Sequence, residues 1–125
     1  MRHRLRSAGS LVALVLMTAT FATTVPATAD TPLVAESTVR LVEYAIEPSE
    51  LGVPAGPLTL RLENVGIRRH NLVLLVDGAE LTSPEVRPGD TVVWTLEAVQ
   101  PGRYLYWCGE YRHLEKGMAG TLIVE

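Results

Sequence analysis

The residues best able to bind a transition metal are scarce in this sequence, and most of them lie close together near its carboxyl end. The sequence has one cysteine, Cys108, and His113 and Met118 follow it in a Cys-x4-His-x4-Met pattern. His70 lies upstream, in a turn that enters an apolar segment. The other histidine and the other methionines fall within the first 17 residues. Together the four residues offer one thiolate, two imidazoles and one thioether, so we consider them as one candidate metal site.

Taken singly, each of the four has an ordinary structural explanation, such as a small buried hydrophobe for the cysteine or a core filler for the methionine. As a set they match the donors of a copper electron-transfer site, with two imidazoles, one thiolate and a weak axial thioether. Zinc sites favour thiolates and histidines, and a thioether is a poor zinc ligand. An iron triad needs a carboxylate, whereas Glu110 and Glu115 are explained more simply as solvated loop charges. Copper is therefore the predicted metal, and the single cysteine excludes a centre bridged by two thiolates.

Short strands separated by glycine and proline turns are predicted to position these residues. Alternating or apolar segments suited to strands occur at residues 39–46, 58–63, 72–76, 91–96, 103–107 and 120–124. The sequence therefore predicts an all-β fold, a Greek-key β-sandwich or barrel with about seven to eight strands. The segment from Cys108 to Met118 would link the last two strands. Gly109, Gly117 and Gly120 would let its backbone bring the ligands to one point.

The amino-terminal segment has the pattern of an export signal. Basic side chains within the first six residues precede an apolar stretch at 11–17, and Ala27-Thr28-Ala29 is a small-residue cleavage signature. We therefore predict a signal peptide at 1–29, a flexible leader at 30–37 and a copper-binding domain at 38–125. The alternative is a retained membrane anchor, although the apolar stretch is short for a span. The predicted location is outside the cytoplasm, in a periplasm, in the extracellular space or on the outer face of a membrane.

Charge and composition narrow the function classes. Without residues 1–29, the 125-residue chain leaves 96 residues with 14 acidic and 8 basic side chains, a formal charge of −6. This part has no basic run, so nucleic-acid binding is not expected. One cysteine cannot form an intrachain disulfide, and a domain of this size is marginally stable without added support. A bound metal would supply that support.

Two longer motifs resemble the cupredoxins, the type 1 blue copper protein family that includes plastocyanin and azurin. One is His70-Asn71 followed by a hydrophobic strand. The other is Tyr104-x-Tyr106-Trp107-Cys108-x4-His113-x3-Gly117-Met118-x-Gly120, followed by an apolar strand. Residues 53–64 also resemble the early strands of that family. The resemblance covers most of residues 38–125, and it implies the cupredoxin fold.

The resemblance also implies a role for each residue that matches the motifs. His70 would be the upstream imidazole ligand of one type 1 copper ion, Cys108 the thiolate, His113 the imidazole nearer to solvent and Met118 the axial thioether. Asn71 would tie the two ligand loops together. The backbone carbonyl of the residue before His70, Arg69, would approach copper from the other axial side.

The function implied is an exported one-electron carrier between redox proteins, using one copper ion that cycles between Cu(II) and Cu(I). Copper delivery or sequestration is the alternative, although such proteins favour exchangeable surface sites rich in His or Met. We expect no enzymatic activity, no small-molecule substrate and a monomer. The expected partner-docking residues are Leu114, Ala119, Arg68, Arg112 and Lys116. The charged residues near the ligands are four basic ones, Arg68, Arg69, Arg112 and Lys116, and two acidic ones, Glu110 and Glu115. They would give the copper end about +2 on an acidic domain.

Overall fold

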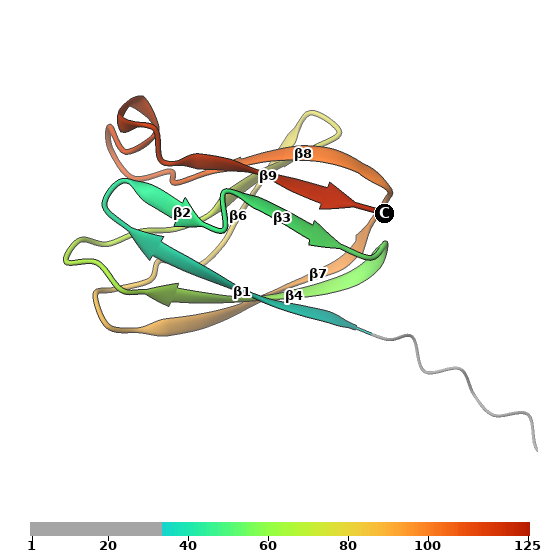
Figure 1. The fold of residues 1–125 in the computed structure, drawn as a ribbon, viewed down its shortest axis with the longest axis horizontal. Helices are drawn as coiled ribbons and strands as arrows, with labels where there is room; N and C mark the ends of the chain where they lie inside the picture. The colour runs from blue at the N-terminus through green and yellow to red at the C-terminus, as the bar shows by residue number, and fades with distance from the viewer. Residues whose placement is uncertain (1–33) are drawn as a thin grey trace, which may run out of the picture.

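The computed structural model describes residues 34–125, so the predicted signal peptide at 1–29 lies outside the described residues. The described chain is a sandwich of two β-sheets (Figure 1). The strands are β1 (Ala35–Val42), β2 (Ala45–Glu47), β3 (Glu50–Val53), β4 (Gly56–Asn64), β5 (Val73–Val76), β6 (Ala79–Thr82), β7 (Thr91–Val99), β8 (Gly102–Trp107) and β9 (Ala119–Val124). One sheet has the strand order β2-β1-β4-β7, and the other has the order β3-β9-β8-β5-β6. The prediction of an all-β sandwich is confirmed, with nine strands in place of seven to eight.

Alternating leucines show how the sequence builds the core. In β4, Leu58, Leu60 and Leu62 are buried, while the side chains between them are at least partly exposed. This is the period-two pattern expected of a strand with one face on the core. β1 lies parallel to β4, and β7 lies antiparallel to it on the other side.

Among the described residues, no helix is long and apolar enough to cross a membrane.

The chain turns at a point where the sequence predicted a continuous strand. Residues 39–46 form the end of β1, a turn at Glu43 and Tyr44, and the start of β2. Leu41 and Ile46 are both buried, yet a straight strand would direct an odd and an even residue to opposite faces. The turn makes Leu41 and Ile46 direct partners in the antiparallel β1–β2 pair, so both side chains reach the same core.

Three further differences concern short segments. β1 begins at Ala35, so residues 35–37, expected in the leader, instead pair with β4. β3 pairs with β9, and β6 forms an exposed edge beside β5. Neither β3 nor β6 was predicted, because β6 has no buried residue and β3 lies among the prolines and glycines of residues 48–57.

The loops that carry the candidate ligands gather at one end of the sandwich (Figure 1). The loop between β8 and β9, the loop after β4 and the turn between β1 and β2 all lie at this end, away from the carboxyl terminus. A bridge between His70 and Val86 joins the segment between β6 and β7 to the same end. The strands therefore act as a scaffold that brings distant parts of the sequence together.

Candidate metal centre

Cys108 and Met118 lie at the two ends of one loop. Cys108 follows Trp107, which pairs with Ala119 at the mouth of the loop. The Cys108 N–H donates to the Met118 carbonyl at 3.0 Å, which closes the loop. Both side chains are buried in the hydrophobic core, Cys108 at 1% exposure and Met118 at 0%. The β8–β9 pairing therefore brings together Cys108 and Met118, the predicted ligands at the two ends of this loop.

The middle of this loop turns His113 back toward Cys108. A short 3-10 helix, η1 (Leu114–Lys116), follows His113, and Gly117 ends it with a φ of 90°, a left-handed conformation open to glycine. The chain then reverses, and the Met118 N–H donates to the His113 carbonyl at 3.1 Å. As a result His113 Nδ1 lies 3.4 Å from Cys108 Sγ.

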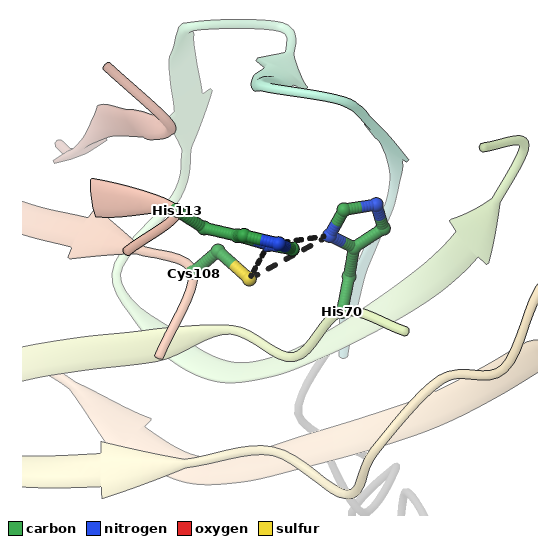
Figure 2. Close-up of side chains that lie close together, drawn as sticks. All are labelled: His70, Cys108 and His113. Carbon is green, nitrogen blue, oxygen red and sulfur yellow. Dashed lines mark hydrogen bonds between the residues drawn. The ribbon is translucent and has the colours of Figure 1, made fainter. Parts of the chain in front are cut away.

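His70 reaches the same point from the loop between β4 and β5. Its backbone is fixed by two hydrogen bonds with Val86, one donated at 3.1 Å and one accepted at 2.7 Å. Its side chain is fully buried, and its Nδ1 lies 3.2 Å from His113 Nδ1 and 3.7 Å from Cys108 Sγ. Figure 2 shows these three donor atoms facing one another. They lie within 4.8 Å of one another, and this is the one such group in the described residues.

The chemistry of these donors fits one copper ion. One sulfur and two imidazole nitrogens converge at a buried point, and the buried thioether residue Met118 closes the same loop. This is the ligand set of a type 1 site, whereas zinc would gain little from a thioether. His70, Cys108, His113 and Met118 thus form a site compatible with a single type 1 copper.

Burial shifts the pKa values of Cys108 and His113 toward their neutral forms. It raises the pKa of the Cys108 thiol, and hydrogen bonds with the backbone of Asn71 and Glu110 only partly offset this. Burial also lowers the pKa of His113, and the nearby His70 adds to the effect. The neutral form of the His113 imidazole, which has a lone pair for a metal, is therefore favoured. Burial favours the thiol form of Cys108, and a bound metal cation would favour the thiolate in its place.

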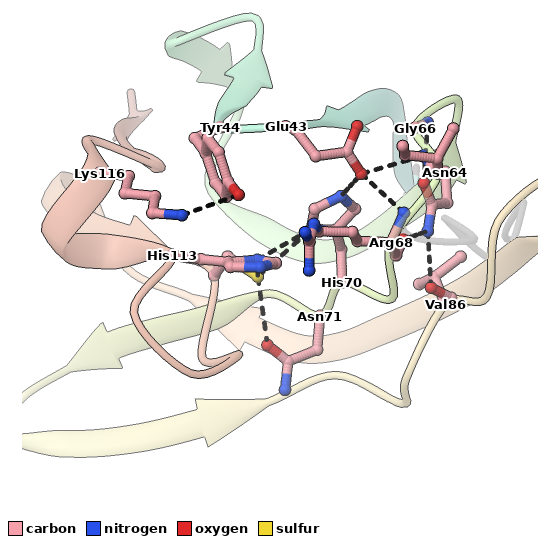
Figure 3. A network of polar contacts seen from close by, with 12 residues as sticks. Glu43, Tyr44, Asn64, Gly66, Arg68, His70, Asn71, Val86, His113 and Lys116 are labelled. Atoms are coloured by element: carbon pink, nitrogen blue, oxygen red, sulfur yellow. Dashed lines mark hydrogen bonds and ion pairs between the residues drawn. The ribbon is translucent and has the colours of Figure 1, made fainter.

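Asn71 lies between the two ligand loops. Its Oδ1 accepts a hydrogen bond from the Gly109 N–H at 2.7 Å and lies 3.9 Å from Cys108 Sγ (Figure 3). A residue next to His70 is thereby joined to the residue after Cys108. The Arg69 side chain pairs with Glu85 at 3.3 Å, and the approach of its backbone carbonyl to the metal stays a prediction.

The protein surface around His113 combines apolar and charged residues. His113 is 7% exposed and lines an open pocket of about 420 Å³. Other lining residues include Arg68 and the strongly exposed Ile67 and Tyr111, which the sequence interpretation did not single out. Of the predicted docking residues, Leu114, Ala119, Arg112 and Lys116 are exposed in or beside the His113 loop.

The charge expected at this end is offset by residues from other segments. The predicted excess of two positive charges counted only residues next to the ligands in sequence. The structure adds Glu85, which pairs with Arg69, and Glu43, which contacts His70. Counting these two carboxylates brings the formal charge of the named groups to zero. Arg112 is further paired with Glu115 at 3.1 Å.

The turn between β1 and β2 contributes two residues that the sequence interpretation missed. The Tyr44 ring meets the His113 ring edge-on at 5.1 Å, and its hydroxyl accepts a hydrogen bond from Lys116 at 2.9 Å. Glu43 Oε1 lies 3.1 Å from His70 Nε2. Burial tends to raise the pKa of Glu43, but hydrogen bonds from the Arg68 amide and neighbouring donors outweigh it, so the pKa is lowered. The sequence contained one indication of this turn. The apolar residues 41 and 46 are an odd and an even position, which a straight strand would direct to opposite faces.

Asn64 holds the loop before His70. It is 2% exposed, and its side-chain amide donates to the carbonyls of Arg68 at 2.7 Å and Val86 at 2.8 Å. Its Oδ1 accepts the Gly66 N–H at 2.9 Å. The sequence indicated a turn at residues 64–66, but not that this side chain would connect three segments near the site.

Known structures share this fold. Auracyanin A from Chloroflexus aurantiacus, described as a "blue" copper protein, is 24% identical, with a TM-score of 0.65 over 74% of this chain and 99% of that chain. Reduced auracyanin from Roseiflexus castenholzii is 21% identical, with a TM-score of 0.65 over 73% of this chain and 97% of that chain. A multicopper oxidase is 20% identical, with a TM-score of 0.59 over 74% of this chain and 42% of that chain. At these identities the likeness establishes the fold.

Sequence comparison identifies the family. No curated protein sequence matches the chain. A family model described as "Cupredoxin-like domain" matches residues 10–124, which is most of the chain. The match agrees with the two-sheet fold and with the buried His–Cys–His cluster. The chain therefore belongs to the family of cupredoxin-like domains.

Proposed function

We propose that this protein is an exported type 1 blue copper protein that carries single electrons between redox partners. The observation that carries the proposal is the convergence of His70, Cys108 and His113 at one buried point, with each ligand held by its own backbone contacts. When bound, copper would supply the one-electron chemistry by cycling between Cu(II) and Cu(I).

The residues around the site support a carrier because they resist rearrangement. His70 is fixed to Val86 by two backbone hydrogen bonds, and the Cys108–Met118 loop is closed by another. Asn71 joins the two segments through Gly109. A site that keeps its shape in both oxidation states needs little reorganisation when an electron is gained or lost. The barrier to electron transfer is therefore small. The surrounding core excludes water and favours a raised potential.

His113 is the proposed exit for the electron. It is the one imidazole ligand with any exposure, and it lines the surface pocket. The exposed Ile67, Tyr111 and Leu114 beside it supply apolar surface for a redox protein to dock against. Since the positive excess expected here is cancelled, we propose that docking depends on these apolar residues more than on charge.

Copper delivery or sequestration is the alternative function. It favours exposed ligands that exchange copper quickly, whereas His70 and Met118 are fully buried. We propose a non-enzymatic role as well, because one ligand cluster is present in the described residues and the pocket beside it is open. Export rests on the signal pattern at residues 1–29, and the monomeric state remains part of the proposal.

The test is the optical spectrum of the purified protein with Cu(II). A bound Cys108 thiolate should give an intense visible charge-transfer band, which Cys108→Ala should abolish. Glu110→Gln changes a carboxylate of the same loop and should keep the band. Weak d–d absorption alone at saturating copper would contradict the type 1 assignment.

Thermal unfolding gives an independent test of copper binding. Binding to the folded state at 1,000-fold excess over Kd stabilises it by about 4 kcal/mol. For a domain of this size this raises Tm by roughly 15–30 °C. Equal melting of the metal-free and copper-loaded forms would contradict a preformed site.

A further inference from the structure

Glu43 contacts the buried ligand His70 from a distant part of the sequence. It lies in the turn between β1 and β2, and its Oε1 is 3.1 Å from His70 Nε2, on the ring edge away from Cys108 and His113 (Figure 3). The His70 side chain is 0% exposed and the Glu43 side chain is 19% exposed. The carboxylate therefore faces the ring from the rim of the site, where little water can replace it.

This contact determines which nitrogen of His70 holds the proton. A carboxylate oxygen can only accept a hydrogen bond, so a separation of 3.1 Å requires a proton on Nε2. The opposite tautomer would place an Nε2 lone pair against a negative oxygen inside a buried site. With the proton on Nε2, the Nδ1 lone pair faces Cys108 Sγ and His113 Nδ1. This is the form of His70 that can bind a metal.

Other contacts show that the position of Glu43 is built into the fold. The same Oε1 accepts the Ile67 N–H at 2.9 Å and the Arg68 N–H at 2.7 Å. Gly66 leaves the space that the carboxylate fills, since a Cβ there would lie 2.5 Å from each of its oxygens. The Asn64 Oδ1 holds Gly66 in place by accepting a hydrogen bond from the Gly66 N–H. The loop before His70 is thus shaped around this carboxylate.

The charge of Glu43 also acts on the ligand. A carboxylate that accepts the second ring N–H of a metal-binding histidine orients the ring and makes it a stronger donor. A negative charge one imidazole away from the metal favours the more highly charged oxidation state, and the buried ring between them limits screening.

We propose that Glu43 is a positioning residue for the copper centre. It keeps His70 in the Nε2–H tautomer with Nδ1 directed into the site, and its charge stabilises Cu(II) relative to Cu(I). The second part rests on the proposed copper function, whereas the first is a property of the metal-free protein.

Three variants and one control separate orientation from charge. Glu43→Gln keeps an oxygen acceptor in the same place but removes the charge. Glu43→Ala removes both, and Gly66→Ala keeps the charge but displaces the carboxylate from His70. Glu85→Gln is the matched control, because it removes a carboxylate that pairs with Arg69, next to His70, and that forms no hydrogen bond or ion pair with either imidazole. Circular dichroism on each variant shows whether the fold is retained.

The first measurement uses the metal-free protein. Imidazole ¹⁵N NMR shifts should show His70 as the Nε2–H tautomer in the wild type, in Glu43→Gln and in Glu85→Gln. In Glu43→Ala and Gly66→Ala the signal should shift toward a mixture of tautomers. An Nδ1–H tautomer in the wild type, or an unchanged signal in folded Glu43→Ala, would overturn the positioning role.

The second measurement uses copper. Glu43→Ala should bind copper roughly 10- to 100-fold more weakly than wild type, the usual cost of losing such a partner. Glu43→Gln should retain most of the affinity but raise the reduction potential by more than Glu85→Gln does. Equal potentials in these two variants would refute the charge effect. Absence of a blue band in the wild type would refute the proposed function, while the metal-free NMR result would still decide the orientation of His70.

Discussion

Replacing Asn71 by alanine tests how the two ligand loops are held in register. The Asn71 Oδ1 accepts the Gly109 N–H at 2.7 Å and lies 3.9 Å from Cys108 Sγ, so alanine removes the side-chain link between the His70 segment and the start of the Cys108 loop. The His70 backbone remains fixed to Val86, and the Cys108 N–H remains fixed to Met118. The change therefore loosens the relative position of the ligands without unfolding either loop.

The expected magnitude follows from these contacts. Loss of one hydrogen bond lowers the free energy of unfolding by about 0.5–1.5 kcal/mol. For a domain of this size, this corresponds to a Tm lowered by roughly 2–12 °C. Loss of a partner that orients a metal ligand typically weakens metal binding roughly tenfold or more, or about 1.4 kcal/mol and upward. We therefore expect Asn71→Ala to bind copper about tenfold more weakly and to show a shifted charge-transfer band.

Ser83→Ala is the matched control for this prediction. The Ser83 hydroxyl accepts the Leu72 N–H at 2.9 Å and donates to the Pro84 carbonyl at 2.9 Å, close to the same loop but without contact to a ligand. It should lower Tm by a comparable amount and leave the copper band and affinity unchanged. Melting curves and copper titrations on both variants make the comparison. If Asn71→Ala also left the band and the affinity unchanged, Asn71 would have only a structural role.

Three further predictions concern the predicted axial ligand, the core and the proposed docking surface. Met118→Leu should keep copper but raise the reduction potential measured by voltammetry, because a donor that stabilises Cu(II) is lost; an unchanged potential would make Met118 a packing residue only. Tyr106→Phe removes a buried hydroxyl that donates to the Pro48 carbonyl, and it should lower the free energy of unfolding, measured with a chemical denaturant, by about 1–2 kcal/mol. Tyr104→Phe removes an exposed hydrogen bond and should lower it by less than about 0.5 kcal/mol. Equal losses in the two variants would contradict the role of burial. The double variant Ile67→Ser with Tyr111→Ser should slow electron self-exchange, measured from NMR line broadening in mixtures of oxidised and reduced protein, while the copper spectrum stays intact; a rate equal to wild type would show that docking does not use these residues.

The sequence was sufficient to predict the all-β fold and the residues of the buried His70–Cys108–His113 cluster. The alternating leucines of β4 make one face of the strand apolar wherever the strand lies. Cys108, His113 and Met118 belong to one short loop, so their spacing alone indicated that they could converge. His70 was identified for a different reason, since few other residues in the chain could complete a copper site.

Tertiary structure alone brought Glu43 and Tyr44 to the metal centre. They are 26 or more residues from the nearest ligand in sequence, and the β1–β2 turn that carries them was predicted as continuous strand. Their places depend on Leu41 and Ile46 packing against one core and on a loop before His70 that leaves room for a carboxylate. Such contacts have no signature in local periodicity.

Charge at the copper end was also decided by the fold. Summing residues next to the ligands in sequence predicted an excess of two positive charges, but Glu43 and Glu85 reach the same end from other segments. A field at a protein surface depends on distance in space, and neighbours in space need not be neighbours in sequence. Residue type and spacing therefore indicated which side chains could supply the donor atoms of this site. The orientation of those side chains and their electrostatic surroundings depended on how the two sheets bring separate loops together.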